Sequence, residues 1–134
     1  MIDVLSGFEA LDRHVKSSSL NFKDAIIDYY KNLGKEQSYS VVENASVVNN
    51  GIDYGRVELV WVEPQVSFNL EFGKTEDIYK KIFLNLMLEP EHAVFILSSK
   101  SQCKPKDVAE IIRKTPQLAG LNTVVLDVSG KKVF

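Results

Sequence analysis

The sequence predicts an α/β domain in which a central mixed β-sheet lies between helices. The apolar residues first recur at about every 3.6 positions, and from residue 39 the period changes to about 2, with clean alternation from Val66 to Phe72. Strands that follow one another without a helix come first, and strands separated by helices come later. Short turns favour antiparallel pairs and helical crossovers favour parallel ones, so the sheet is expected to be mixed. The predicted order is helix, three strands as a meander, helix, strand, helix, strand.

Length and composition indicate one globular domain. The chain has 134 residues, of which 45% are hydrophobic and 25% are charged. We expect one domain over residues 1–134, with residues 1–20 as a helical extension and residues 21–134 as the core. The net charge of -2 disfavours a protein that simply coats nucleic acid, because such proteins are usually basic. A local basic face is still compatible with this charge.

Cysteine usage and the start of the chain predict a cytoplasmic protein. Cys103 is the single cysteine, so neither an internal disulfide nor a zinc site with a second cysteine can form. Acidic residues follow Met1, where a secretory signal would carry basic ones. The longest apolar stretch, residues 82–88, is interrupted by Asn85 and is too short to cross a bilayer.

The first part of the chain reads as helical. Apolar residues at helical spacing between Ile2 and Val15 predict a short helix that ends at the serines of residues 17–19. Asn21 is expected to cap the next helix, and Gly34 stands where a C-terminal cap is expected.

Strands follow in the middle of the chain. The predicted strands are Tyr39 to Val48, Gly55 to Val62 and Val66 to Phe72. The residues between them, Asn49 to Gly51 and Glu63 to Gln65, are turn formers, because Asn and Gly tolerate positive φ and Pro cannot donate to a ladder.

Helices and strands alternate in the last part of the chain. Thr75 is expected to cap a helix that runs to about Leu88. A continuous apolar run from Ala93 to Leu97 predicts a strand that is buried on both faces. Pro105 opens a helix to about residue 114, and the last strand is predicted over residues 122–128.

The hairpin of the second and third strands suggests a pair of acids. If the loop spans Glu63 to Val66, then Val62 pairs with Ser67 and Glu58 lies opposite Glu71. Opposed carboxylates repel, and a divalent cation, a lysine or a shared proton can compensate for the repulsion. The alternative is that both acids are solvated on an open face. Their ion-pair partners would then be Arg56, Lys74 or Lys81.

The same segments resemble a known family. The element order, with residues 55–61 (GRVELVW) and residues 68–73 (FNLEFG), resembles the PD-(D/E)xK, or restriction-endonuclease-like, nuclease superfamily. The resemblance extends from Asn21 to Val128 and implies an αβββαβαβ core that hydrolyses DNA phosphodiesters with Mg²⁺, for which Mn²⁺ substitutes. It makes Glu58 the acid of the second strand, and residues 69–71 the acid-x-lysine triplet of the third.

The triplet departs from the family pattern. Asn69 stands where the family has an acid, and Glu71 stands where it usually has a lysine. Lys74, or Lys80 or Lys81 on the following helix, would supply the missing lysine. Further acids are Glu43 on the first strand and Asp53, whose side chain reaches the correct face only if Gly55 makes a bulge. The resemblance implies the catalytic residues Glu58, Glu71, Lys74 and Lys81, and the metal ligands Glu58, Asn69, Glu71 and Glu43.

Two functions follow as hypotheses. The first is a small metal-dependent nuclease-like domain that acts on or binds DNA. The second is a catalytically inactive relative that serves as a binding or homo-oligomeric assembly module, with apolar surface near Tyr29, Tyr30 and Trp61 forming a homodimer. The degenerate triplet and the acidic net charge favour the second.

The histidines, the cysteine and the basic residues of the last third indicate a functional site less clearly. His14 and His92 are expected to be structural or exposed. Lys100 and Lys104 flank Cys103 in the sequence, which would lower the pKa of its thiol. Basic residues of the last third would form a phosphate-facing rim or a solvated face: Lys100, Lys104, Lys106, Arg113, Lys114, Lys131 and Lys132.

Overall fold

The fold is a mixed sheet of six strands whose order in space follows their order in the chain. The computed structural model describes residues 1–134. The first three strands pair antiparallel, the third to fifth pair parallel, and the sixth is antiparallel to the fifth. The predicted mixed α/β class is confirmed. The strands are β1 (Val41–Asn49), β2 (Ile52–Trp61), β3 (Val66–Leu70), β4 (His92–Leu97), β5 (Asn122–Asp127) and β6 (Lys132–Val133).

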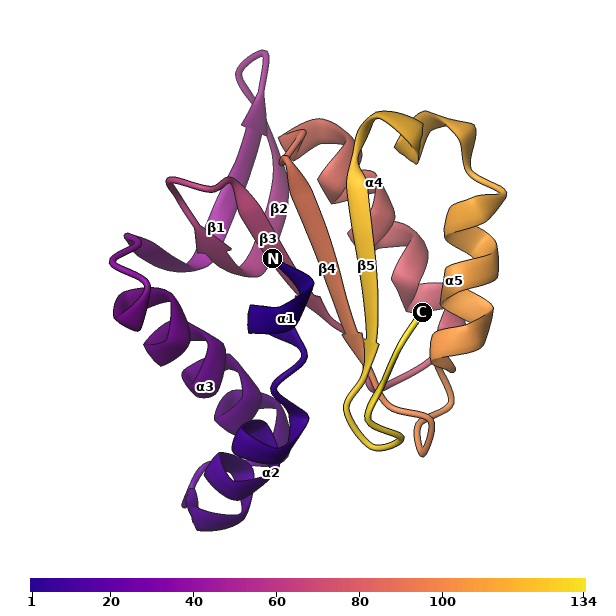
Figure 1. Cartoon of the computed structure of the whole chain (residues 1–134). Helices are drawn as coiled ribbons and strands as arrows, with labels where there is room; N and C mark the ends of the chain where they lie inside the picture. Colours follow the sequence, from indigo (N-terminus) through magenta and orange to yellow (C-terminus); the bar gives the residue numbers. More distant parts are fainter.

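Helices cover both faces of the sheet (Figure 1). Helices α1, α2 and α3 lie on one face, and α4 and α5 lie on the other. None of the helices combines the length and the apolar character that crossing a membrane requires. The helices are α1 (Ile2–Leu5), α2 (Phe8–Ser17), α3 (Phe22–Glu36), α4 (Ile78–Leu88) and α5 (Pro105–Arg113), with short 3-10 turns at Thr75–Asp77 and Pro116–Gly120.

The first twenty residues belong to the core. They form two short helices where one was expected, and Leu5 and Leu11 are buried in the cluster beneath α3. Asn21 caps α3 as predicted, because its Oδ1 accepts a hydrogen bond of 2.9 Å from the backbone N–H of Asp24.

Gly34 does not end α3, contrary to the prediction. The helix continues past it, and the indole of Trp61 lies so close to Gly34 that a Cβ there would overlap the ring. The left-handed residue is Ser38, with φ of 66°. The N–H of Tyr39 donates to the carbonyl of Gly34 at 2.9 Å, which closes the last turn. The glycine is therefore required for close packing of helix on sheet.

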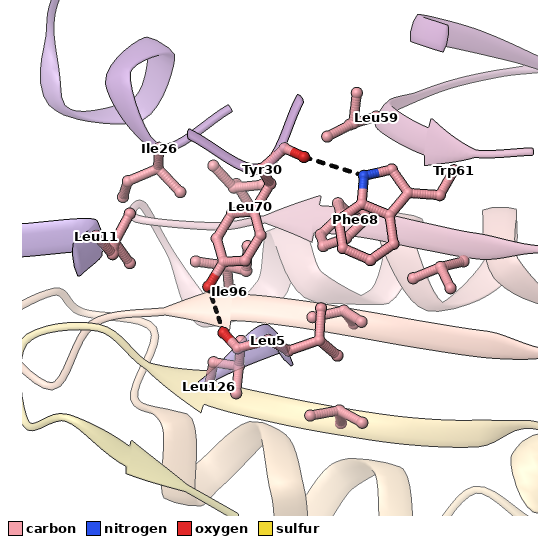
Figure 2. Packing of buried hydrophobic residues seen from close by; sticks show 13 residues of the cluster. Leu5, Leu11, Ile26, Tyr30, Leu59, Trp61, Phe68, Leu70, Ile96 and Leu126 are labelled. Atoms are coloured by element: carbon pink, nitrogen blue, oxygen red, sulfur yellow. Dashed lines mark hydrogen bonds between the residues drawn. The ribbon is translucent and has the colours of Figure 1, made fainter. Parts of the chain in front are cut away.

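The larger core cluster lies between the sheet and α1 to α3 (Figure 2). Trp61 Nε1 donates to the carbonyl of Tyr30 at 3.0 Å, and the Tyr30 hydroxyl donates to the carbonyl of Leu5 at 2.8 Å. Both aromatic side chains are thus buried with their polar atoms satisfied. The prediction that Tyr30 and Trp61 contribute to a homodimer surface is wrong, because both side chains are buried.

Several predicted boundaries shift. β3 ends at Leu70, before the predicted Phe72. Thr75 starts a 3-10 turn and makes no side-chain cap, so it is not the expected N-cap of the helix. The register of β1 and β2 changes between Val47 and Val48, which is a bulge beside Gly55.

Candidate functional site

The β2–β3 hairpin has a different register from the predicted one. Val60, not Val62, pairs with Ser67. The turn occupies residues 62–65, and Gln65 adopts a left-handed conformation with φ of 52°. The chain therefore turns before the position that the sequence suggested. The shift is an even number of residues, so the paired residues of β2, Leu59 to Trp61, keep their faces but change their partners.

The predicted opposition of Glu58 and Glu71 is consequently wrong. The pairing of β2 with β3 begins at Leu59, which pairs with Phe68, so it does not include Glu58. Glu71 lies beyond the end of β3, where its carboxylate accepts a hydrogen bond of 2.9 Å from the N–H of Gly73. The two acids do not form a pair across the hairpin.

Glu58 lies between two residues of β2 whose side chains pack on opposite faces of the sheet. The side chain of Val57 packs in a cluster with Leu84 of α4, whereas Leu59 packs in the cluster on the α3 side of the sheet. In a flat strand both would point to the same face. The residue opposite Glu58 in β1 is Asn44, which has a φ of 49°. This distortion lets helices from both layers reach the Glu58 carboxylate.

A lysine from each helix layer approaches this carboxylate. Lys81 Nζ of α4 donates to Glu58 Oε1 at 2.5 Å, and Lys23 Nζ of α3 lies 3.7 Å from the same oxygen. The side chains of Glu58 and Lys81 are only 10% and 18% exposed, so water screens their attraction weakly. The other oxygen, Glu58 Oε2, is buried without a hydrogen-bond partner. Lysine, not a second acid, is therefore the neighbour of Glu58.

Next to this ion pair is a fully buried group of polar side chains. Asn85 Nδ2 donates to Asn69 Oδ1 at 2.8 Å, and the Ser67 hydroxyl donates to Asn85 Oδ1 at 2.5 Å. Asn69 Nδ2 donates to the carbonyl of Val94 at 3.1 Å. Asn85 also donates to the carbonyl of Lys81 at 2.7 Å, which connects the amide group to the ion pair.

Sequence reasoning did not identify Ser67 and Asn85 as site residues. The available signal was Asn85 itself, a polar residue inside an apolar helical run. Buried amides of this kind require complete hydrogen bonding, and such a position therefore predicts polar partners on the neighbouring strand.

The other predicted site residues are dispersed. Glu43 lies 3.4 Å from Lys31 Nζ and lines the same hollow as Glu58. Lys74 is exposed at the start of the 3-10 turn. Asp53 is exposed, and its carboxylate accepts a hydrogen bond of 3.0 Å from the N–H of Gly55.

These positions do not gather the predicted metal ligands around one point. No three His, Cys, Asp or Glu side chains in the structure are close enough to hold a metal ion together. Mg²⁺ in proteins is usually held by one or two carboxylates with water and phosphate. Here the buried carboxylate of Glu58 already binds a lysine, and the Asn69 carbonyl oxygen already accepts a hydrogen bond. The arrangement does not fit the ligand set that the sequence suggested.

Cys103 also differs from the prediction. Its side chain is buried, and burial raises the pKa of the thiol to about 11, with further increases from the nearby charges of Glu71, Asp107 and Asp77. Lys104, which was expected to lower this pKa, donates instead to the carbonyl of Ser99 at 2.7 Å. A thiol of this kind is a packing group, because the thiolate is the reactive form.

Some of the basic residues gather at the carboxyl ends of β4 and β5. Lys104, Lys106 and Lys132 line a hollow there together with Asp127. Burial raises the pKa of Asp127, but backbone N–H groups that donate to its carboxylate outweigh this and hold the pKa below its usual value. This carboxylate organises a loop, and the hollow lies apart from the residues that surround Glu58. His14 is structural as expected, since its Nε2 lies 2.9 Å from the carboxylate of Asp28.

No family model, curated protein or solved structure matches this chain.

Proposed function

We propose that the chain is a non-catalytic binding or assembly module with a nuclease-like arrangement of helices and strands. The observation that carries this proposal is the ion pair of Glu58 and Lys81, whose atoms are 2.5 Å apart. The one buried carboxylate at the expected metal position is neutralised by the protein itself.

Metal-dependent hydrolysis requires carboxylates that are free to bind the ion. The metal stabilises the developing charge and activates water, so it must remain in place through the reaction. At Glu58 an incoming cation would meet the positive charge of Lys81 on the same carboxylate, and that lysine is itself largely buried. Separating a buried ion pair leaves one charge without compensation, which is strongly unfavourable. Asn69 adds no charge that would favour the metal.

A second candidate is the metal-dependent nuclease. The buried, unpartnered Oε2 of Glu58 favours it, because this oxygen retains the capacity to bind a cation. Lys81 beside an acid is also the arrangement that the family resemblance implies. In this candidate Lys81 would turn from Glu58 to the phosphate of DNA, while Mg²⁺ would occupy the freed carboxylate.

Isothermal titration with MgCl₂ and MnCl₂ distinguishes the two candidates. The matched proteins are the native chain, Glu58→Gln, and Glu71→Ala as a control at the acid that lies elsewhere. We expect no saturable metal binding with a Kd below about 1 mM, which corresponds to a binding free energy of roughly -4 kcal/mol. We also expect no cleavage of single- or double-stranded DNA. Binding that disappears in Glu58→Gln but persists in Glu71→Ala, together with cleavage, would establish the nuclease. Asn69→Asp serves as a further test, since cleavage gained only in this variant supports the inactive-relative hypothesis.

Assembly is supported by apolar surface on α4 and the adjoining hairpin. Tyr79 and Phe83 on the outer side of α4 are 56% and 47% exposed, and Phe83 contacts Tyr54 of β2 with ring centroids 5.6 Å apart. Val48 and Ile52 at the hairpin tip are also exposed. Covering these exposed apolar side chains removes them from water, so this face would gain from cover.

A second copy of the chain is the occupant that we propose for this surface. β1 is an edge strand of nine residues, and an edge of this length presents unpaired backbone groups that another β1 can bind. The mass measured by light scattering should be twice the chain mass of 15.1 kDa, and Phe83→Glu should halve it. A monomer at all concentrations would contradict self-assembly but leave ligand binding open. The exposed Phe134→Glu is the control.

A further inference from the structure

The hollow at the carboxyl ends of β4 and β5, called the basic hollow below, concentrates positive charge. Its volume is about 560 Å³, within the usual range of small-ligand pockets. Most of its lining comes from two segments, residues 98–106 after β4 and residues 128–134 after β5. These segments contain five lysines and no acidic residue, although acids outnumber basic residues in the whole chain.

The position of the basic hollow in the fold is one where α/β proteins bind ligands. Because β4 and β5 are parallel, the segments that follow them lie at the same edge of the sheet (Figure 1). Ligands of open α/β sheets bind outside the carboxyl ends of the strands, between such segments. Charge and topology therefore indicate the same place.

The lysines of the basic hollow have no carboxylate partner. Lys104, Lys106 and Lys132 line it with exposed side chains. None of the three forms an ion pair in the structure. Lys104 Nζ donates to the carbonyl of Ser99 at 2.7 Å, which holds this side chain in place and leaves its charge unneutralised. The hollow thus presents positive charge that the protein itself does not compensate.

Two aspartates in the lining leave this charge in excess. Asp127 is buried, and its Oδ1 accepts hydrogen bonds from three backbone N–H groups, those of Ser99, Ser129 and Gly130. Its carboxylate is therefore already bound by the loop. Asp107 is the other aspartate, so three lysines stand against two aspartates in the lining. A ligand with a negatively charged group is favoured.

An aromatic side chain adjoins the lysines. Phe134 lines the basic hollow and its side chain is 49% exposed. Its backbone N–H donates to the carbonyl of Val125 at 2.9 Å, so the residue is held beside β5. Positive side chains next to an exposed aromatic ring bind nucleotides, because the phosphate is attracted to the charges and the planar base stacks on the ring.

We propose that the basic hollow binds a nucleotide, with its phosphate at Lys104, Lys106 and Lys132 and its base against Phe134. A free mononucleotide and one unit of a single-stranded nucleic acid present the same chemistry. The basic hollow shares no residue with the hollow beside Glu58 or with the apolar surface of α4. The inference therefore goes beyond the proposed assembly function and does not depend on it.

Isothermal titration of the purified chain, in EDTA and without divalent cations, tests the inference. The probes are AMP, adenosine, ribose 5-phosphate and a short single-stranded oligoadenylate. We expect AMP to bind saturably and about tenfold tighter than adenosine or ribose 5-phosphate, because phosphate and base both contribute. Tighter binding of oligoadenylate than of AMP would identify nucleic acid as the source of the nucleotide. Equal or weaker binding would identify a free nucleotide.

Variants of the lining separate the contributions of charge and ring. Lys106→Ala and Lys132→Ala should each weaken AMP binding about fivefold, because each removes a charge beside the phosphate. Phe134→Ala should weaken AMP binding and leave ribose 5-phosphate unchanged, since that probe has no base. Lys35→Ala, at an exposed lysine of α3, is the matched control and should change nothing. All four side chains are exposed, so the variants should keep the fold.

Three results would overturn the inference. The first is the absence of saturable binding of both AMP and oligoadenylate. The second is an affinity that both lysine variants leave unchanged, or that Lys35→Ala lowers equally, because the attraction would then be nonspecific. The third is equal affinity for AMP and ribose 5-phosphate, since the base would make no contact. None of them affects the metal titration at Glu58 or the mass in solution, so failure of this inference is distinguishable from failure of the proposed function.

Discussion

The two faces of β3 are equally buried but are stabilised in different ways. All residues of the strand, Val66–Leu70, are buried. On one face Val66, Phe68 and Leu70 pack in the apolar cluster under α3. On the other, Ser67 and Asn69 form hydrogen bonds with Asn85 of α4.

Because of this difference, the two faces of β3 tolerate different substitutions. An apolar face depends on filled volume, so it accepts changes that conserve volume. A buried polar face depends on complete pairing, so the loss of one partner leaves the others unsatisfied. The ion pair of Glu58 and Lys81 lies beside the polar face, which is why the candidate site occurs there.

The largest effect is expected on the apolar face. The Phe68 ring lies between Tyr30 and Trp61, with centroid distances of 5.2 Å and 4.7 Å. Phe68→Ala should lower the free energy of unfolding by about 4 kcal/mol, because it creates a cavity in a rigid aromatic cluster. Urea denaturation followed by fluorescence of Trp61 measures this. The exposed Phe134→Ala should change the value by less than about 0.5 kcal/mol.

A charge on the polar face should have a smaller effect that depends on pH. Asn85→Asp removes the donor to Asn69 and to the carbonyl of Lys81, and should cost about 3 kcal/mol at pH 7. Burial favours the neutral form, so the pKa of the introduced carboxyl rises above its unfolded value of about 3.9. Its contribution is then most favourable below that unfolded pKa and is lost as the pH rises through the folded pKa.

Denaturation at pH 4 and pH 7 measures this dependence. The loss relative to the native chain should be smaller at pH 4, and the exposed Asn122→Asp should show no such difference. An equal loss at both pH values would mean that the polar face admits water.

The smallest effect is expected for the hydroxyl of the polar face. Ser67→Ala removes the donor to Asn85 Oδ1 and one of the two acceptors of Asn69 Nδ2, which keeps its bond to Val94. The loss in the free energy of unfolding should be about 2 kcal/mol, because the buried Asn85 Oδ1 is left without a donor. Urea denaturation at pH 7 is the measurement. An increase in stability would show that Asn85 can reorient, and would weaken the contrast between the two faces.

Much of the fold was predictable because local patterns decide it. Alternation over residues 66–70 and the apolar run of β4 identify their strands, and the side chain of Asn21 caps α3 as its type predicts. The same alternation places Ser67 and Asn69 together on the face of β3 opposite to Phe68. These features depend on residues that are neighbours in the sequence.

The partner of Glu58 was not predictable in the same way. The hairpin register depends on the residue that takes the left-handed conformation, and Gln65 is not a typical choice for it. Lys81 was one of several lysines within reach, and only the docking of α4 brings it to the carboxylate.

Local sequence patterns predicted the mixed α/β class, the approximate positions of α3 to α5 and of β1 to β5, and the burial of both faces of β4. These follow from periodicity and from turn chemistry, which act over a few residues. Tertiary structure alone decided that Gly34 packs against Trp61, that Tyr30 is in the core, and that a lysine, not an acid, faces Glu58. The reason is physical, because contacts between elements depend on register and docking angle. The shift of two residues in the hairpin separates Glu71 from Glu58, and the docking of α4 brings Lys81 to Glu58.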